Sequence, residues 1–285
     1  MRLSGRVLVV AGSDSSGGAG IQADIKTITA LGAYAATAIT ALTAQNTLGV
    51  HGILPVPPDF VAWQMEAVLD DIGADAVKTG MLGDAASIER VCATLEARAA
   101  GIPVVVDPVM RATGGTRLLA VEAVTVLKRR LLPMAAVLTP NLPEAEVLAG
   151  MPIPDRAAMH RAATALLTLG AQAVLLKGGH LAGDTVIDLL ATEDGVEEYA
   201  APRIDTRHTH GTGCTLASAL ATGLAQGMAL RAAVDRARRY VRAAIATAPG
   251  LGAGNGPLNH AVTVESGEEA RRAFRDETKR LIEKD

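Results

Sequence analysis

Short apolar runs alternate with longer amphipathic stretches along most of the 285-residue chain. Runs of four or five Val, Leu, Ile and Ala residues between turn signals are typical of strands buried on both faces, and the alanine-rich stretches between them are typical of crossover helices. This alternation predicts βαβ units around a parallel sheet in one α/β domain. Strands are expected at residues 7–11, 76–79, 103–106, 136–139 and 173–177. Helices are expected at residues 21–31, 59–71, 87–99, 121–131 and 156–169.

Three further segments have a different pattern. Residues 34–45, rich in Ala, Thr and Ile, fit either a helix or a strand. Residues 185–190 and 195–199 predict an antiparallel hairpin at the edge of the sheet. Residues 265–285 are rich in charge and predict a solvated helix or a loose tail, so we expect a domain at 1–262 and a tail at 263–285.

The composition is that of an ordinary globular protein, with 49% hydrophobic residues, 20% charged residues and a formal net charge of −3. A slightly acidic chain is not expected to bind nucleic acid through a broad basic surface. We also expect no membrane association, because no stretch reaches the ~18 apolar residues that a span needs. The two cysteines, Cys92 and Cys214, give no disulfide framework and favour a cytoplasmic location. Cys92 is expected in the core.

Unusual chemistry follows directly after five of the expected strands. Ligands of open parallel sheets bind outside the carboxyl ends of the strands, so these segments predict one shared site. The strand-end segments are 12–24, which is rich in glycine, Lys78-Thr79-Gly80-Met81, Asp107-Pro108-Val109-Met110, Asn141-Leu142-Pro143-Glu144 and Lys177-Gly178-Gly179-His180.

The first glycine loop matches neither the dinucleotide pattern Gly-x-Gly-x-x-Gly nor the Gly-Lys-Ser/Thr ending of a P-loop, which disfavours a dehydrogenase and a P-loop kinase. It suits close approach of the backbone to a compact ligand, with the carboxylate of Asp24 as an acceptor. The amides of Gln45 and Asn46 are able to read the edge of a ring. The structural alternative is a turn in which these residues are solvated.

Hard oxygen donors and a lysine follow the later strands. Asp107, Asn141 and Glu144 suit Mg²⁺ that bridges phosphates, although Asn141 and Glu144 also have the spacing of a helix capping box. Lys177 suits a phosphate as a point charge, or else it is a surface lysine.

Residues 208–215 place Gly211, Thr212 and Gly213 directly before Cys214 and a helix expected at 216–226. The N–H groups and the positive dipole end of that helix predict an anion hole. In this field we expect a depressed pKa for the Cys214 thiol, which would then accept a proton or act as a nucleophile. The alternative is a capped helix with a buried cysteine. The nearby histidines lack the pattern of a zinc site and are expected to form hydrogen bonds within the loop.

In combination and order, several of these motifs closely resemble the hydroxymethylpyrimidine/phosphomethylpyrimidine kinases of thiamine biosynthesis, which belong to the ribokinase-like group. The resemblance spans nearly the whole chain and implies a three-layer α/β/α fold with a mostly parallel central sheet, ATP and Mg²⁺, and a homodimer. The motifs that carry it are residues 11–24, 43–47, 78–82, 139–146, 176–180 and 209–215.

The resemblance also implies roles for individual residues. The pyrimidine pocket would contain Asp24 and Gln45, lined by Gly12, Ala19, Met81 and Val109. Phosphates and Mg²⁺ would be bound by Lys177, Asn141, Glu144 and Asp107, and the anion hole would be Gly211, Thr212 and Gly213. Cys214 would be the base for phosphorylation of the hydroxymethyl group, and the monophosphate would then be phosphorylated again. Arg111 departs from the pattern of the family. The rival functions are a pyridoxal kinase and a non-catalytic pyrimidine-binding regulatory protein.

Overall fold

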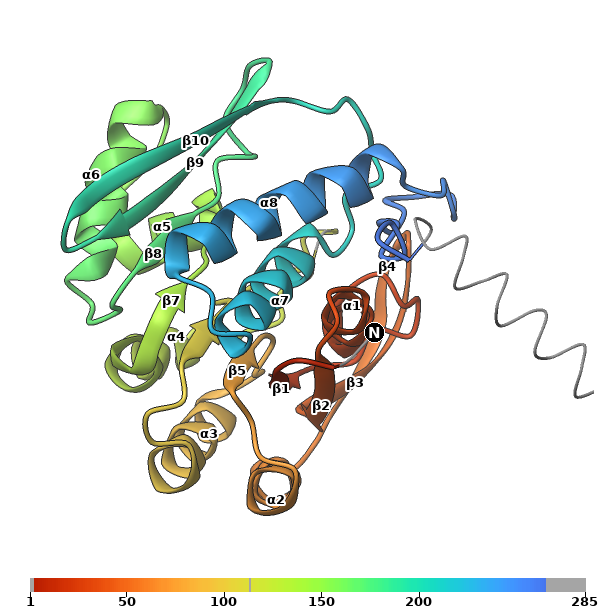
Figure 1. The fold of residues 1–285 in the computed structure, drawn as a ribbon, viewed down its shortest axis with the longest axis vertical. Helices are drawn as coiled ribbons and strands as arrows, with labels where there is room; N and C mark the ends of the chain where they lie inside the picture. Colours follow the sequence, from red (N-terminus) through yellow and green to blue (C-terminus); the bar gives the residue numbers. More distant parts are fainter. Residues whose placement is uncertain (1–2, 113, 265–285) are drawn as a thin grey trace, which may run out of the picture.

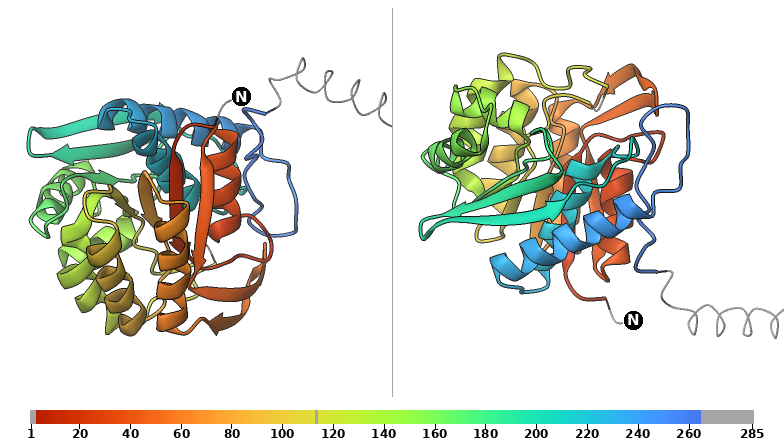
Figure 2. Two further views of the ribbon diagram at one scale, coloured as in Figure 1. Left: turned by 60° about the horizontal axis from the view of Figure 1, so that its bottom comes forward. Right: turned by 90° about the horizontal axis from the view of Figure 1, so that it is seen from above.

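The computed structural model describes residues 3–112 and 114–264 of the chain and contains a mostly parallel sheet of eight strands (Figures 1 and 2). The strand order is β10-β9-β8-β7-β6-β5-β1-β2, in which β9 and β10 form the antiparallel edge. The strands are β1 (Arg6–Ala11), β2 (Tyr34–Ile39), β5 (Ala76–Thr79), β6 (Val104–Val106), β7 (Ala135–Leu138), β8 (Val174–Leu176), β9 (Thr185–Thr192) and β10 (Gly195–Pro202). Outside this sheet, β3 (Ala41–Asn46) and β4 (Gly49–Pro55) form an antiparallel ribbon.

Helices cover both faces of the sheet, which gives three layers. Successive side chains of β1 point to opposite faces of the sheet, and each face packs against its own layer of helices. Leu8 and Val10 join one apolar cluster, and Val7 and Val9 join the other. The first cluster packs under α2 (Pro58–Asp71), α3 (Ala85–Arg98), α4 (Ala123–Val126), α5 (Leu142–Ala149) and α6 (Arg156–Leu167). The second packs under α1 (Gly20–Ala30), α7 (Thr212–Ala225) and α8 (Leu230–Ala246).

Most predicted elements are confirmed, and the differences have physical causes. The ambiguous segment 34–45 forms two strands, β2 and β3, which run into different sheets. The helix expected at 121–131 is divided into α4, a π-helical turn (Leu127–Leu131) and a 3-10 turn (Leu132–Met134) that contains Pro133. Strand β4 and helix α8 are not predicted. Residues 265–285, for which we expect a solvated helix or tail, lie outside the described residues.

Among the described residues, no helix is both long enough and apolar enough to cross a membrane.

His260 predicts a pH dependence of stability. Its side chain is buried, its Nε2 lies 3.0 Å from the Thr215 hydroxyl, and burial lowers the pKa of the imidazole to about 4. Between about pH 4 and pH 6.5 the unfolded chain therefore binds more protons at this residue, so this contribution to stability is lost as pH falls. Relative to a His260→Gln variant, the parent should lose about 2 kcal/mol of unfolding free energy between about pH 7.5 and pH 5.

Urea unfolding of both proteins at the two pH values measures this difference. The comparison with the variant is needed because burial raises the pKa of Glu144 to about 7, which acts in the opposite direction over the same range. Equal pH dependence in parent and variant would show that His260 does not carry the effect.

Candidate active site

The carboxyl ends of the parallel strands open into a cavity of about 590 Å³. The structure brings the predicted site residues together around it, with the exceptions of Asp24 and Asn46, whose side chain accepts from two N–H groups in the turn between β3 and β4. Those that line the cavity are Gly12, Ala19, Gln45, Met81, Asp107, Val109, Asn141, Glu144, Lys177, Gly211, Thr212, Gly213 and Cys214. Residues far apart in the sequence thus line one cavity, as their positions at strand ends predict.

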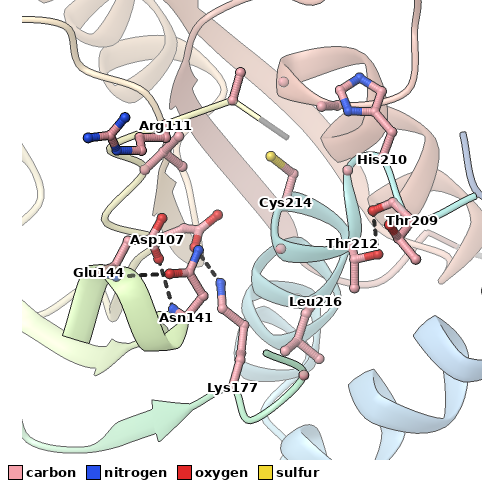
Figure 3. A pocket seen from close by; sticks show the side chains of 18 of the residues that line it. Asp107, Arg111, Asn141, Glu144, Lys177, Thr209, His210, Thr212, Cys214 and Leu216 are labelled. Atoms are coloured by element: carbon pink, nitrogen blue, oxygen red, sulfur yellow. Dashed lines mark hydrogen bonds and ion pairs between the residues drawn. The ribbon is translucent and has the colours of Figure 1, made fainter. Parts of the chain in front are cut away.

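Helix α7 begins at the cavity and presents its first turn to it (Figure 3). Gly211 is the N-cap with φ +84°, and a Cβ there would lie 1.8 Å from the carbonyl oxygen of Gly18. Only glycine permits this left-handed, closely packed turn. The helix starts one turn earlier than predicted, so Gly213 and Cys214 lie in the first turn, where N–H groups have no helical partner and the dipole favours an anion.

Cys214 lines the cavity at this helix end, but its thiol does not have the depressed pKa expected from the sequence. Burial raises the pKa of the thiol to about 12. The Lys78 ammonium opposes this rise, and the carboxylates of Asp24 and Asp107 add to it. The expectation of a depressed pKa is wrong because burial of the thiol, together with the two carboxylates that the fold brings beside it, outweighs the effect of the helix terminus. In the free protein the thiol is protonated.

Asp24 lies behind the cavity wall, which differs from its expected contact with a substrate ring. Both of its carboxylate oxygens accept from the Lys78 ammonium, at 2.9 and 3.0 Å, and the Ser218 hydroxyl donates to it at 2.6 Å. Both side chains of the ion pair are 0% exposed. Burial alone would lower the pKa of Lys78, but the charge of Asp24 raises it above its ordinary value. Asp24 is thus engaged by the protein, while Lys78 lines the cavity.

Lys177 reaches the cavity from the end of β8. Its ammonium donates to Asp107 at 3.0 Å, and Thr139 donates to the same carboxylate oxygen at 3.2 Å. A Cβ on Gly213 would lie 3.1 Å from the lysine nitrogen, so the absence of a side chain brings the first turn of α7 close to this ammonium. A cation and a helix N-terminus therefore face the same part of the cavity, which favours phosphate there.

Asn141 and Glu144 form the predicted capping box at the start of α5. Glu144 N–H donates to the Asn141 side chain at 2.9 Å, and Asn141 N–H donates to the Glu144 carboxylate at 2.8 Å. Burial raises the pKa of Glu144 to about 7, opposed by Lys177 and reinforced by the nearby charge of Asp107. Two carboxylates that repel each other at the wall of the cavity are hard oxygen donors, and a divalent cation such as Mg²⁺ fits them. The cap and the metal role are compatible.

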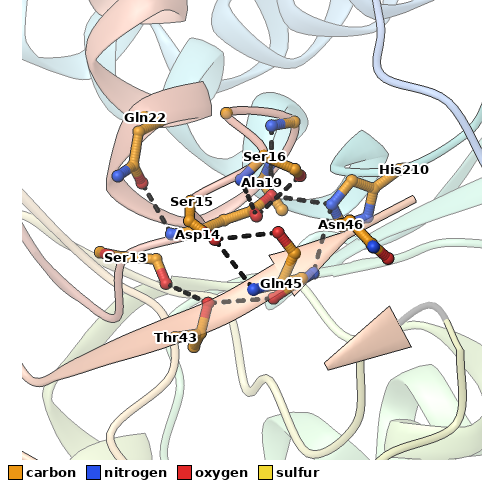
Figure 4. A network of polar contacts seen from close by, with 12 residues as sticks. Ser13, Asp14, Ser15, Ser16, Ala19, Gln22, Thr43, Gln45, Asn46 and His210 are labelled. Atoms are coloured by element: carbon orange, nitrogen blue, oxygen red, sulfur yellow. Dashed lines mark hydrogen bonds and ion pairs between the residues drawn. The ribbon is translucent and has the colours of Figure 1, made fainter. Parts of the chain in front are cut away.

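The opposite end of the cavity is built on the glycine loop after β1 (Figure 4). Asp14 is buried within this loop and accepts from His210 at 2.8 Å and from the N–H groups of Ser16, Gly18 and Ala19. These bonds hold the pKa of Asp14 at about 2, although burial opposes them. The carboxylate therefore joins the loop to the residue that precedes the anion hole.

The model of the phosphomethylpyrimidine kinase family matches residues 14–259, which include most of the residues that line this cavity. The chain belongs to this family. The relative ThiED, a thiamine biosynthesis bifunctional protein of Geobacter sulfurreducens, is 55% identical over 261 residues. That match covers 92% of this chain and 53% of ThiED, so the chain spans about half the length of this relative.

Two further comparisons cover nearly whole chains. The hydroxymethylpyrimidine/phosphomethylpyrimidine kinase of Streptomyces coelicolor is 52% identical over 256 residues, 89% of this chain and 93% of the relative. The structure of the pyridoxal kinase from Staphylococcus aureus in complex with AMP-PCP and pyridoxal has a TM-score of 0.83 at 36% identity, covering 92% of this chain and 95% of that one. The predicted ribokinase-like α/β/α fold is confirmed, and the family to which the chain belongs is one of kinases.

Sequence reasoning assigned no role to several residues that the structure places at the cavity. Lys78 lies within the strand β5, all four residues of which are buried, and this position was the available signal for a lysine with a buried partner. Arg203 donates to three carbonyl groups in the loop after Lys177, those of Gly179, Leu181 and Gly183, and so fixes the shape of that loop. Arg111 also lines the cavity and donates to the carbonyl of Gly115.

Proposed function

We propose that this protein transfers the γ-phosphoryl group of ATP to 4-amino-5-hydroxymethyl-2-methylpyrimidine, and then phosphorylates the monophosphate to the diphosphate, in thiamine diphosphate biosynthesis. The observation that carries the proposal is the position of Cys214, in the first turn of α7 between the Lys177 ammonium and the glycine loop. Membership of the phosphomethylpyrimidine kinase family supports the same substrate.

The substrate ring would occupy the end of the cavity lined by Gly12, Ala19, Gln45, Met81 and Val109. Methionine and valine pack against the faces of a flat ring, and a carboxamide forms paired hydrogen bonds with an aminopyrimidine. A Cβ on Gly12 would lie 2.5 Å from the Met81 methyl group, so a side chain there would displace the end of the methionine. Asp24 supports this pocket from behind through Lys78 rather than by contact with the ring.

The phosphates would lie at the opposite end, against Lys177 and the first turn of α7. There the Lys177 ammonium and the N–H groups of the loop stabilise the charge that spreads over the transferring phosphoryl group. Asp107 and Glu144 would hold Mg²⁺, which when bound neutralises phosphate charge. Most of the rate then comes from positioning and electrostatic stabilisation.

Cys214 would accept the proton of the substrate hydroxyl in its thiolate form as the new O–P bond forms. Because the monophosphate is already an anion, the second transfer needs a base less than the first. We therefore expect Cys214→Ala to reduce the first transfer much more than the second. The rate of the first transfer should also rise with pH across the neutral range, because the thiolate fraction increases toward the raised pKa.

Separate assays of the two transfers, with Cys92→Ser as the matched control, measure this difference. Cys92 is fully buried in the core, as predicted, and lies outside the cavity lining. Equal losses in both transfers, or an unchanged pH profile in Cys214→Ala, would contradict the role of a base.

We further propose that the protein is a homodimer in which a second copy covers the β3–β4 ribbon and α2. Leu42 and Leu54 are a cross-strand pair on this ribbon and are both exposed, and Phe60 and Trp63 on α2 are exposed as well. Large exposed apolar side chains grouped in pairs, as on this ribbon and on α2, are typical of an interface. Sedimentation of the parent should give the mass of a dimer and that of Leu54→Glu the mass of a monomer; a monomeric parent would refute the proposal.

A cytoplasmic location would follow from the use of ATP and fits two cysteines that are both free thiols.

A further inference from the structure

The side-chain amide of Gln45 lies between two polar neighbours at the substrate end of the cavity (Figure 4). As drawn in Figure 4, the amide oxygen faces the hydroxyl of Thr43 and the amide nitrogen faces Nε2 of His210. Each pair of atoms is 3.3 Å apart. The oxygen and the NH₂ group of an amide have nearly the same shape, so the hydrogen-bond partners decide which end is which.

Nε2 of His210, the atom that faces this amide, carries a proton that it donates to Asp14 at 2.8 Å and shares with Gln45 only at the longer distance of 3.3 Å. The reason is Asp14, whose carboxylate lies 2.8 Å from His210 Nε2 and accepts from four further donors. These donors are the N–H groups of Ser16, Gly18 and Ala19 and the Ser16 hydroxyl. A carboxylate surrounded by donors is ionised and acts only as an acceptor, so Nε2 of His210 carries the proton that it donates. A protonated Nε2 has no lone pair with which to accept from an NH₂ group.

The hydrogen bonds of Thr43 favour the same orientation of the Gln45 amide. Its hydroxyl has a single hydrogen, and it donates this hydrogen to the carbonyl of Ser13 at 2.9 Å. Toward Gln45 the hydroxyl is therefore an acceptor, which requires the NH₂ end of the amide. Both neighbours therefore favour the amide turned by 180° from the orientation drawn in Figure 4, with the carbonyl of Gln45 toward His210 and its NH₂ group toward Thr43.

We propose that His210, held by Asp14, is a positioning residue that fixes the Gln45 amide in this orientation and so makes the site select a ring nitrogen beside an amino group. This inference rests on the proposed function and extends it to substrate selection. An amide has two N–H bonds and two lone pairs, and this network uses one of each. The second N–H remains for a ring nitrogen and the second lone pair for the adjacent amino group.

The same residue connects substrate selection to the phosphate end of the site. His210 directly precedes Gly211, the N-cap of α7. The backbone N–H of His210 donates to the carbonyl of Gly256 at 3.1 Å. A Cβ on Gly18 would lie 2.5 Å from the imidazole, so the glycine loop packs directly against it. The imidazole is therefore held firmly from several sides, as a positioning group must be.

Calorimetric binding to the full chain, without ATP, tests the selection. The ligands are the 4-amino-5-hydroxymethyl-2-methylpyrimidine and its analogue without the amino group. We expect the parent to prefer the amino compound by at least about tenfold, His210→Leu to reduce the preference to within about threefold, and His210→Gln, whose NH₂ group can donate, to restore most of it. Thr43→Val should also weaken the preference, and Thr43→Ser should keep it.

Nitrogen-15 NMR of the free parent supplies a readout that needs neither ligand nor turnover. It should show a proton on Nε2 of His210; a bare Nε2 would overturn the proposal. An undiminished preference in folded His210→Leu would do the same, and if that variant fails to fold, an undiminished preference in Thr43→Val decides against it. Binding of the amino compound without phosphoryl transfer would contradict the proposed function and leave the selection standing. Failure of the parent to bind either pyrimidine would contradict both.

Discussion

Replacing Lys177 by methionine should lower kcat for phosphorylation of the pyrimidine by about 10²- to 10³-fold, the loss typical for removal of one preorganised group that stabilises transition-state charge. The reason is the position of the ammonium, which lies at the cavity, 3.0 Å from Asp107 and against the first turn of α7. Methionine keeps the length of the side chain and removes its charge. The KM for the pyrimidine should change little, because that ring binds at the other end of the cavity.

Steady-state kinetics on purified Lys177→Met and Lys177→Arg measure this effect. Arginine keeps the charge but spreads it over a planar group, so we expect it to recover only part of the rate. Lys128→Met, in the π-helical turn outside the cavity lining, is the matched control and should retain the parental kcat. A kcat within about threefold of the parent in Lys177→Met would remove this residue from the mechanism.

Replacing Lys78 by methionine should lower the free energy of unfolding by about 3–5 kcal/mol, because it leaves the fully buried carboxylate of Asp24 without its cation. The remaining Ser218 hydrogen bond does not neutralise that charge. Burial would then drive Asp24 toward its protonated form, since desolvation already raises the pKa of this carboxyl. Urea unfolding of the parent and Lys78→Met measures the loss.

A second variant distinguishes an unpaired charge from a general disturbance of the core. Combining Lys78→Met with Asp24→Leu and Ser218→Ala removes all the polar groups of this cluster together, and buried pairs replaced in this way are often neutral. We expect most of the stability to return. A triple variant no more stable than Lys78→Met would show that packing, and not charge pairing, accounts for the loss.

The parts of this structure that depend on local pattern are predictable from the sequence. Strand β5 has the predicted bounds, because four buried residues between turn signals leave few alternatives. Asp107, Asn141 and Lys177 follow parallel strands, which end at one edge of the sheet. Their positions in the sequence therefore also predict that they line one cavity. Strand β4 is not predicted because most of its residues are exposed, and α8 is not predicted because half of its buried residues are alanine, which gives a weak apolar pattern.

What could not be predicted depends on partners that only the fold supplies. Asp24 and Lys78 are 54 positions apart, and nothing in either motif indicates that they neutralise each other. Without that contact, Asp24 is naturally taken as a ligand for the substrate. The pKa of Cys214 was misjudged for the same reason, because burial and two distant carboxylates outweigh the helix end and the Lys78 ammonium.

The most direct test of the proposed activity is ADP release by the purified protein with ATP and three acceptors in parallel: the hydroxymethylpyrimidine, its monophosphate and pyridoxal. We expect turnover with both pyrimidines, a diphosphate as the final product by mass spectrometry, and a kcat/KM for pyridoxal at least about tenfold lower than for the pyrimidine. Turnover with pyridoxal and none with the pyrimidines would identify a pyridoxal kinase, and ADP release with none of the three would contradict a catalytic role for this site.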